Sequence, residues 1–152
     1  MSIVVFFDLG DTLVIPRLSD NGSLLELKVL PFVPDVLDKL RGTEVNNMKL
    51  RLGVISNTGE ETLARMHAMM AAARLLDFFD PTLLLFSSVE GIDKRQKQFF
   101  ERAVQRSGAR PEQCIYVGED EAERGTAEAA RLRTSYHPLH VFHVIDLIAQ
   151  GH

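Results

Sequence analysis

Six polar residues that could bind and transfer a phosphoryl group follow apolar runs of this chain. They are Asp8, Ser56, Asn57, Lys94, Glu119 and Asp120. Asp8 could act as an oxygen nucleophile, while a hydroxyl, an amide and an ammonium group could bind the phosphoryl oxygens. The acids could hold Mg²⁺, which prefers oxygen ligands. The combination predicts phosphoryl transfer, provided that the fold brings these residues together.

The pattern of apolar runs predicts a fold that does so. Strand-like runs alternate with helical patterns, which indicates a parallel sheet with both faces covered by helices. Strands are predicted at residues 3–7, 51–55, 82–86, 114–117 and 133–136, and helices at 34–41, 60–76, 94–107, 122–132 and from 138 onward. The fold class is therefore α/β, a three-layer doubly wound parallel sheet. In such a sheet the carboxyl ends of the strands form one ligand-binding edge.

Two segments interrupt this alternation. The dipeptide Asn21-Gly22 is typical of a tight type I′ turn and predicts a small β-hairpin within residues 14–30. The polar stretch 42–49 is predicted to be a loop.

Each candidate residue also has a simpler structural explanation. Asp8 could merely end its strand, and Ser56 with Asn57 could cap the next helix. Lys94 could be one of several solvated charges, and the acids of residues 119–123 could stabilise a helix N-terminus. The order in which all four features occur along the chain favours one shared site.

Length and composition predict a single domain over residues 1–152. The chain is 45% hydrophobic and carries a formal net charge of -4, so neither nucleic acid nor an anionic membrane is an expected partner. No apolar run approaches the roughly 20 residues that span a bilayer. The N-terminus has no signal-peptide pattern and Cys114 has no second cysteine to pair with. A cytoplasmic protein is expected.

The candidate residues lie in four stretches that resemble the motifs of the haloacid dehalogenase (HAD) superfamily, the aspartate-nucleophile phosphohydrolases. Residues 8–13, Asp-Leu-Gly-Asp-Thr-Leu, resemble its first motif, Asp-x-Asp-x-Thr. Residues 54–57 resemble the second motif, an apolar strand ending in Ser or Thr, and 91–94 resemble the third, which supplies a lysine. Residues 116–123 resemble the fourth, Gly-Asp-x-x-x-Asp. The resemblance covers nearly the whole chain.

The resemblance implies a Mg²⁺-dependent phosphatase, a phosphoric monoester hydrolase that forms an aspartyl-phosphate on Asp8. Mg²⁺ would be held by Asp8, the carbonyl of Gly10 and an acid of the fourth motif, Glu119 or Asp120. Lys94 would serve as a catalytic and phosphate-binding residue.

The resemblance also assigns Ser56 to the phosphoryl group, where Asn57 beside it is expected to bind as well, and it matches the 14–30 hairpin to the family's flap. No cap domain is apparent, so the site should be open. An open site suits a large phosphorylated substrate or a homo-oligomer whose subunits cover one another; a small phosphorylated molecule is the other substrate class.

The chain departs from the family pattern at two positions. Gly10 stands where the family has a second aspartate, which normally protonates the leaving group and activates water. General acid–base catalysis of this kind contributes about 10²–10⁴ in rate. Glu119 stands where the fourth motif usually begins with Asp, and Asp120 or Glu123 could compensate. Slow turnover is expected, with better turnover of esters that have good leaving groups.

Three other readings compete with a phosphatase. Gly10 and Glu119 favour a catalytically degenerate HAD-like domain that serves as a binding or regulatory module. A phospho-accepting receiver domain is disfavoured because its acceptor Asp should end a strand deeper in the chain than Asp8 does. A dehalogenase is disfavoured because it would have no use for the acids of residues 119–123.

Overall fold

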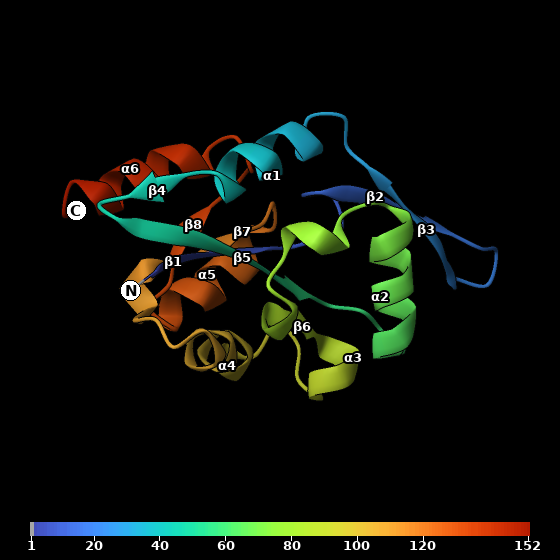
Figure 1. The fold of residues 1–152 in the computed structure, drawn as a ribbon. Coiled ribbons are helices and arrows are strands. Elements are labelled where there is room, and N and C mark those ends of the chain that lie inside the picture. The colour runs from blue at the N-terminus through green and yellow to red at the C-terminus, as the bar shows by residue number, and fades with distance from the viewer. Residues whose placement is uncertain (1) are drawn as a thin grey trace.

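The strand that leads to Asp8 lies at the centre of the sheet. The computed structural model describes residues 2–152. In it β1 (Ser2–Phe7) pairs in parallel with β5 (Met48–Ser56) on one side and with β7 (Cys114–Val117) on the other. β8 (Arg133–Ser135) continues the sheet beyond β7, and β6 (Leu84–Phe86) pairs with the last residues of β5. These five strands are parallel, so their carboxyl ends meet at one edge (Figure 1).

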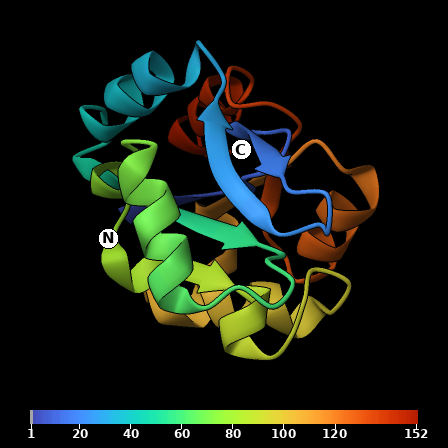
Figure 2. The ribbon, with the colours of Figure 1, turned by 90° about the vertical axis from the view of Figure 1, so that its right-hand side faces the viewer.

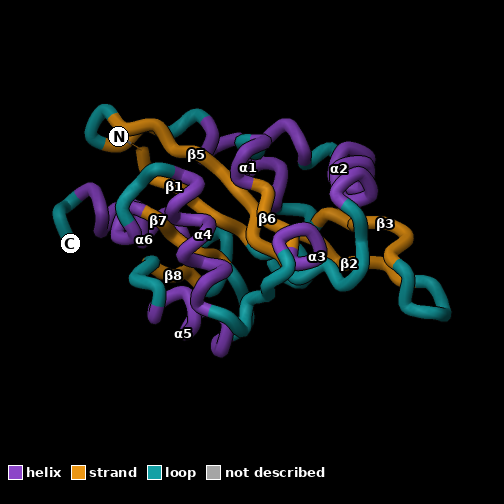
Figure 3. The backbone as a smooth tube through the Cα atoms, turned by 90° about the horizontal axis from the view of Figure 1, so that it is seen from below, coloured by secondary structure: helices purple, strands orange, loops and turns teal. Residues whose placement is uncertain are grey.

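Helices cover both faces of the sheet, which explains why the central strands are apolar throughout. One face carries α1 (Val33–Arg41), α2 (Leu63–Ala72) and α6 (Val141–Ala149), and the other carries α4 (Lys97–Ser107) and α5 (Glu121–Ala129). Successive residues of β1 point to opposite faces: Val5 packs in the first core and Phe6 in the second. Figure 3 shows α4 lying in front of the strands on the second face.

The predicted hairpin forms a separate two-stranded sheet. β2 (Val14–Leu18) pairs antiparallel with β3 (Leu24–Val29), and both lie beside α2 in Figure 2. The turn differs from the predicted one. Gly22 has a left-handed φ of 85°, whereas Asn21 does not, and the strands are joined across Ser19–Ser23 by a longer loop.

The prediction of a loop at residues 42–49 is wrong. β4 (Glu44–Val45) pairs antiparallel with the first residues of β5. Between them Asn46 and Asn47 have φ values of 51° and 64°. Two consecutive left-handed residues define the tight hairpin turn that asparagine tolerates, so a polar sequence here makes a hairpin.

Two helices begin later in the chain than predicted. α2 starts at Leu63, because the Thr62 hydroxyl accepts a hydrogen bond from the Arg65 N–H and so caps the helix. α4 starts at Lys97, and Lys94 lies in the loop between α3 (Ser87–Glu90) and α4. Three short 3₁₀ helices occupy Leu76–Phe78, Pro81–Leu83 and Pro111–Gln113. None of the helices within residues 2–152 has the length and apolar character to cross a bilayer.

Candidate active site

Asp8 is held at the end of the central strand with one carboxylate oxygen bound and the other free. Its N–H donates to the carbonyl of Val117 at 2.9 Å, which anchors the backbone to β7. Its Oδ1 accepts from the Leu9 N–H at 2.8 Å and from Lys94 Nζ at 2.7 Å. Within residues 2–152 no hydrogen bond reaches Oδ2, and the only fully buried polar side-chain atom without a partner is Thr12 Oγ1. Oδ2 is therefore neither hydrogen-bonded nor fully buried.

Burial and charge act in opposite directions on the Asp8 carboxyl. Burial raises the pKa of Asp8 above its usual value, and the nearby charge of Lys94 opposes the shift without cancelling it. The negative charge of Glu119 adds slightly to the increase. A carboxylate buried beside a buried ammonium is costly, and groups perturbed in this way cluster at functional sites, so Asp8 is a candidate functional residue.

Lys94 is buried with 2% of its side chain exposed, so it is not a solvated charge. Its Nζ makes three polar contacts, at 2.7 Å to Asp8, 2.7 Å to Glu123 Oε1 and 3.1 Å to the Tyr116 hydroxyl. Its backbone N–H donates to Asn57 Oδ1 at 3.1 Å, which ties the Lys94 loop to the end of β5. Residues that are far apart in the sequence are thus joined at one point.

Two of the Lys94 partners were not predicted to bind it. Glu123 matches the second acid of the fourth motif by spacing, which is the signal that could have identified it. Tyr116 gives no such signal, because a buried tyrosine in a strand usually looks like core. Burial raises the pKa of the Tyr116 hydroxyl far above its usual value, so the group stays protonated.

The two acids predicted to bind metal have different surroundings. Asp120 Oδ1 accepts a hydrogen bond from the Glu123 N–H at 2.9 Å and so caps α5. One of the two Asp120 carboxylate oxygens is therefore already engaged by the helix backbone. Glu119 is exposed and close enough to Asp8 to affect its pKa. No cluster of three or more acidic, histidine or cysteine side chains suited to a metal occurs within residues 2–152. Asp8, Glu119 and the Gly10 carbonyl are the remaining oxygen donors.

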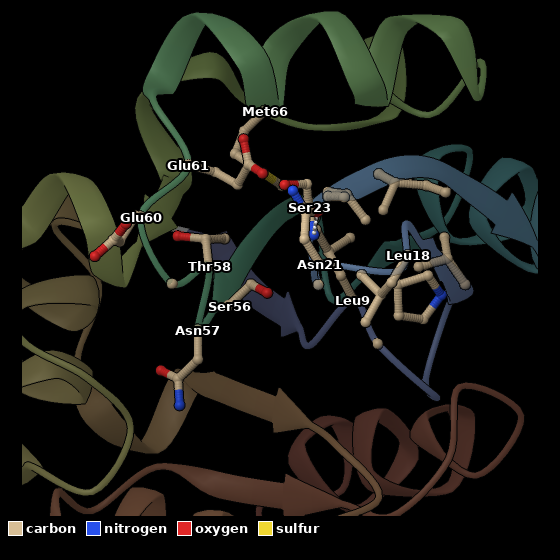
Figure 4. A pocket seen from close by; sticks show the side chains of 17 residues that line it. Leu9, Leu18, Asn21, Ser23, Ser56, Asn57, Thr58, Glu60, Glu61 and Met66 are labelled. Atoms are coloured by element: carbon tan, nitrogen blue, oxygen red, sulfur yellow. Dashed lines mark hydrogen bonds between the residues drawn. The ribbon is translucent and has the colours of Figure 1, made fainter.

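Ser56 and Asn57 end β5 beside a cavity of about 600 Å³ (Figure 4). They do not cap α2, since Thr62 does so. The cavity is lined by Leu9 and Gly10 of the first motif, by the end of β5 and by the hairpin. Asp8 itself does not line the cavity, but its chain neighbours Leu9 and Gly10 do.

Gly10 leaves space where the family's second aspartate would lie. Its φ is not left-handed, and a Cβ atom there would meet only Pro16 Cγ, at 4.0 Å. Asp11 does not replace the missing acid in position, because it has a φ of 62° and is exposed in the turn that follows.

Comparison with known proteins establishes the fold. No protein-family model matches the sequence, and no curated protein sequence matches it. Several solved structures do match this chain in fold. A HAD-superfamily hydrolase of subfamily IA from Geobacter sulfurreducens PCA is 14% identical with a TM-score of 0.69, covering 95% of this chain and 96% of that one. A 2-haloacid dehalogenase from Pseudomonas syringae pv. Tomato DC3000 is 14% identical with a TM-score of 0.71, covering 96% and 99%.

A third structure, proposed to be a phosphoglycolate phosphatase from Lactobacillus plantarum, is 10% identical with a TM-score of 0.68, covering 95% of this chain and all of that one. The class of protein is thus an α/β domain with a mainly parallel central sheet. The fold is that of the HAD superfamily, as the sequence motifs predicted.

Proposed function

We propose that this protein is a Mg²⁺-dependent phosphatase that acts through an aspartyl-phosphate on Asp8. The observation that carries the proposal is the state of the Asp8 carboxylate. Its Oδ1 is fixed by the Leu9 N–H and by Lys94, while Oδ2 is free of hydrogen bonds from residues 2–152. A carboxylate held in this way is oriented as a nucleophile, and orientation alone lowers a reaction barrier substantially.

In the first step Asp8 Oδ2 attacks phosphorus and the bond between phosphorus and the ester oxygen breaks. The leaving alcohol or phenol takes the bonding electrons. Ser56 and Asn57 would donate hydrogen bonds to the phosphoryl oxygens, and Lys94 would neutralise their charge. In the second step water attacks phosphorus and the bond between phosphorus and Asp8 Oδ2 breaks, with the bonding electrons returning to the carboxylate. The water gives up a proton to solvent, and inorganic phosphate is released.

The oxygen donors near Asp8 fit a magnesium ion. Mg²⁺ is commonly held by one or two carboxylates and keeps several waters. Asp8, Glu119 and the Gly10 carbonyl supply such a set, although no third carboxylate joins them among the described residues. Bound there, Mg²⁺ would supply positive charge next to the phosphoryl oxygens.

Gly10 determines which esters this site can cleave well. No acid stands at position 10 to protonate the departing oxygen. A phenolate can leave without a proton far more easily than an alkoxide can, so aryl esters should react faster than alkyl esters.

The same two departures support the second candidate, a degenerate HAD-like binding or regulatory module. Gly10 removes the usual acid, and Glu119 lengthens a metal-binding side chain. A dehalogenase is a weaker candidate despite the fold, because Glu119, the acid proposed to bind metal beside Asp8, would then have no role.

One assay separates the candidates. Hydrolysis of 4-nitrophenyl phosphate is measured with and without Mg²⁺, in the wild type and in Asp8→Asn. Mg²⁺-dependent activity that disappears in Asp8→Asn supports the phosphatase. Absent activity together with absent Mg²⁺ binding, measured by calorimetry, supports the module and rejects the phosphatase.

A further inference from the structure

We infer that the cavity beside Asp8 selects phosphate esters whose leaving group is apolar and carries no second negative charge. This inference rests on the proposed phosphatase function and specifies its substrate class. Sugar bisphosphates, nucleoside diphosphates and phosphorylated carboxylic acids would be poor substrates, while uncharged or cationic aryl esters would be good ones.

The hairpin lines the cavity with apolar side chains. Val14, Pro16 and Leu18 occupy alternate positions of β2 and face the cavity, as alternation along a strand requires. The intervening Ile15 and Arg17 do not line it, and Arg17 instead pairs with Glu26 across the hairpin. The side chains on one face of β2 therefore line the cavity.

The opposite wall is apolar as well. Met66 of α2 and Leu9 line it, while Leu24 and Leu27 of β3 add to the hairpin side. On the hairpin side Leu18 leaves 56% of its surface exposed at the cavity. An aromatic or aliphatic leaving group would cover this surface and gain the free energy of apolar burial. The cavity, at about 600 Å³, falls within the size range of small-molecule sites.

The charges at the cavity exclude a second anion. Glu60 and Glu61 are the charged residues among the described residues that line it, and no lysine, arginine or histidine does. Figure 4 shows Glu61 on the α2 side, facing the hairpin, and Glu60 with its carboxylate pointing away from the hairpin. A second phosphate or a carboxylate on the substrate would approach Glu61, and Arg65, the cation beside Glu61, is already paired with it.

The nearest cations are already engaged. Arg65 binds Glu61 Oε2 through Nε at 3.3 Å and the Leu24 carbonyl through Nη2 at 2.6 Å. Lys94 is engaged by Asp8 and Glu123 and would serve the transferred phosphoryl group. Neither is free to pair with a distal anionic group on the substrate.

The experiment compares three esters that share one ring: 4-methylphenyl, 4-(aminomethyl)phenyl and 4-carboxyphenyl phosphate. We expect kcat/KM for the cationic ester to exceed that for the anionic ester by about tenfold at low salt, and this ratio to shrink at about 0.5 M NaCl as charges are screened. Glu61→Gln should lower the ratio by about threefold. Comparing the ratio between proteins cancels intrinsic differences between the leaving groups.

Glu44→Gln is the matched control, because Glu44 is an exposed acid at the opposite end of the sheet, paired with the start of β5. It removes the same charge and should leave the ratio unchanged. Equal or faster turnover of the anionic ester, or an unchanged ratio in Glu61→Gln, would overturn the inference.

A second pair of variants tests the apolar wall. Leu18→Ser should lower kcat/KM for 4-methylphenyl phosphate relative to methyl phosphate by about fivefold, because it removes apolar surface from the cavity. Ile15→Ser is the control, since Ile15 is 50% exposed on the same strand but faces away from the cavity. Equal effects of both variants would contradict the assignment of this wall.

If the protein hydrolyses none of the esters, binding of non-hydrolysable analogues tests the selectivity of the cavity instead. Titration calorimetry then compares 4-(aminomethyl)benzylphosphonate with 4-carboxybenzylphosphonate, neither of which can be hydrolysed. Tighter binding of the cationic compound would support the cavity's selectivity while the phosphatase proposal fails. Equal binding, or none of either compound, would reject the selectivity as well.

Discussion

The hydroxyl oxygen of Tyr116 lies so close to Gly118 that a Cβ atom at position 118 would be 2.7 Å from it. The ring atoms Cε2 and Cζ would both be 2.9 Å away. Gly118 does not have a left-handed φ, so packing and not backbone conformation requires glycine here. The same hydroxyl contacts Lys94 Nζ at 3.1 Å. A glycine of the fourth motif therefore makes room for the side chain that helps to fix the buried lysine.

Gly118→Ala should damage both stability and activity. The new methyl group must push the Tyr116 ring away, and overpacking of this kind costs about 1–3 kcal/mol of unfolding free energy. Since the displaced hydroxyl loses Lys94, kcat should fall as well. Urea unfolding and aryl phosphate hydrolysis measure the two effects.

Gly125→Ala serves as the control for that substitution. Gly125 lies within α5, and a Cβ atom there would have no neighbour within 4 Å. It should raise stability by about 0.5–1 kcal/mol through helix propensity and leave kcat unchanged. If both alanine variants behaved alike, the packing argument for Gly118 would be wrong.

Gly10→Asp should restore acid–base assistance to the leaving group. The backbone at position 10 accommodates a side chain, and the nearest atom to the new Cβ is Pro16 Cγ at 4.0 Å. We expect kcat for alkyl phosphates to rise by about tenfold or more, with a smaller gain for aryl phosphates that need no proton. Steady-state kinetics on both ester classes measure this difference.

Gly10→Asn is the matched variant, having the same shape without the transferable proton. Gly10→Asn should give no increase in kcat for alkyl phosphates. Efficient alkyl phosphate hydrolysis by the wild type, with no improvement in Gly10→Asp, would show that Gly10 is not the deficiency.

Glu119 and Glu123 should respond differently to removal of their charge. Glu119→Gln should raise the Mg²⁺ concentration needed for half-maximal activity by about tenfold, because it removes a proposed metal ligand. Glu123→Gln should instead lower kcat, because Glu123 contacts Lys94 at 2.7 Å. Magnesium titrations of both variants separate these effects, and identical magnesium dependence of the two would count against the division of roles.

Glu90 should stabilise the loop that carries Lys94, in a manner that depends on pH. The hydrogen bond from Arg106 holds the pKa of Glu90 below its usual value, with help from Arg102. The unfolded chain therefore binds a proton more readily at this residue than the folded chain does. This stabilisation is complete above the unfolded pKa and is lost as the pH falls through the folded pKa.

Glu90→Gln tests this by urea unfolding at neutral pH and at about pH 3. The variant should be less stable by about 1 kcal/mol at neutral pH, since Arg102 and Arg106 are partly exposed and screened. The difference from the wild type should narrow at the lower pH. If the difference in unfolding free energy between wild type and Glu90→Gln were the same at both pH values, the ion pairs of Glu90 would contribute nothing to stability.

Much of the architecture could be predicted because buried parallel strands have a recognisable composition. The run Ile3–Phe7 is apolar at every position, and the structure buries all five residues between two helix layers. The predicted HAD-like fold is confirmed. The hairpin within residues 42–49 was missed because β4 has only two residues, and only the left-handed pair Asn46-Asn47 marks the turn.

The partners of Lys94 could not be predicted in the same way. The sequence predicted Glu119 or Asp120 as a metal ligand, with Glu123 as an acid that could compensate, and assigned none of them to Lys94. The position of each acid relative to the start of α5 decides what its side chain contacts. A residue at the N-cap turns its side chain back to the helix backbone, as Asp120 does. One turn later, Glu123 faces Lys94.

The sequence by itself determined the order of the five parallel strands and the polar residues that follow them. Those features depend on neighbours within a few positions, through apolar periodicity and turn residues. Only the tertiary structure decided that Lys94 is buried among Asp8, Glu123 and Tyr116, and that the hairpin lines a cavity without cations. These contacts join residues as many as 86 positions apart, and packing of helices against the sheet sets their distances.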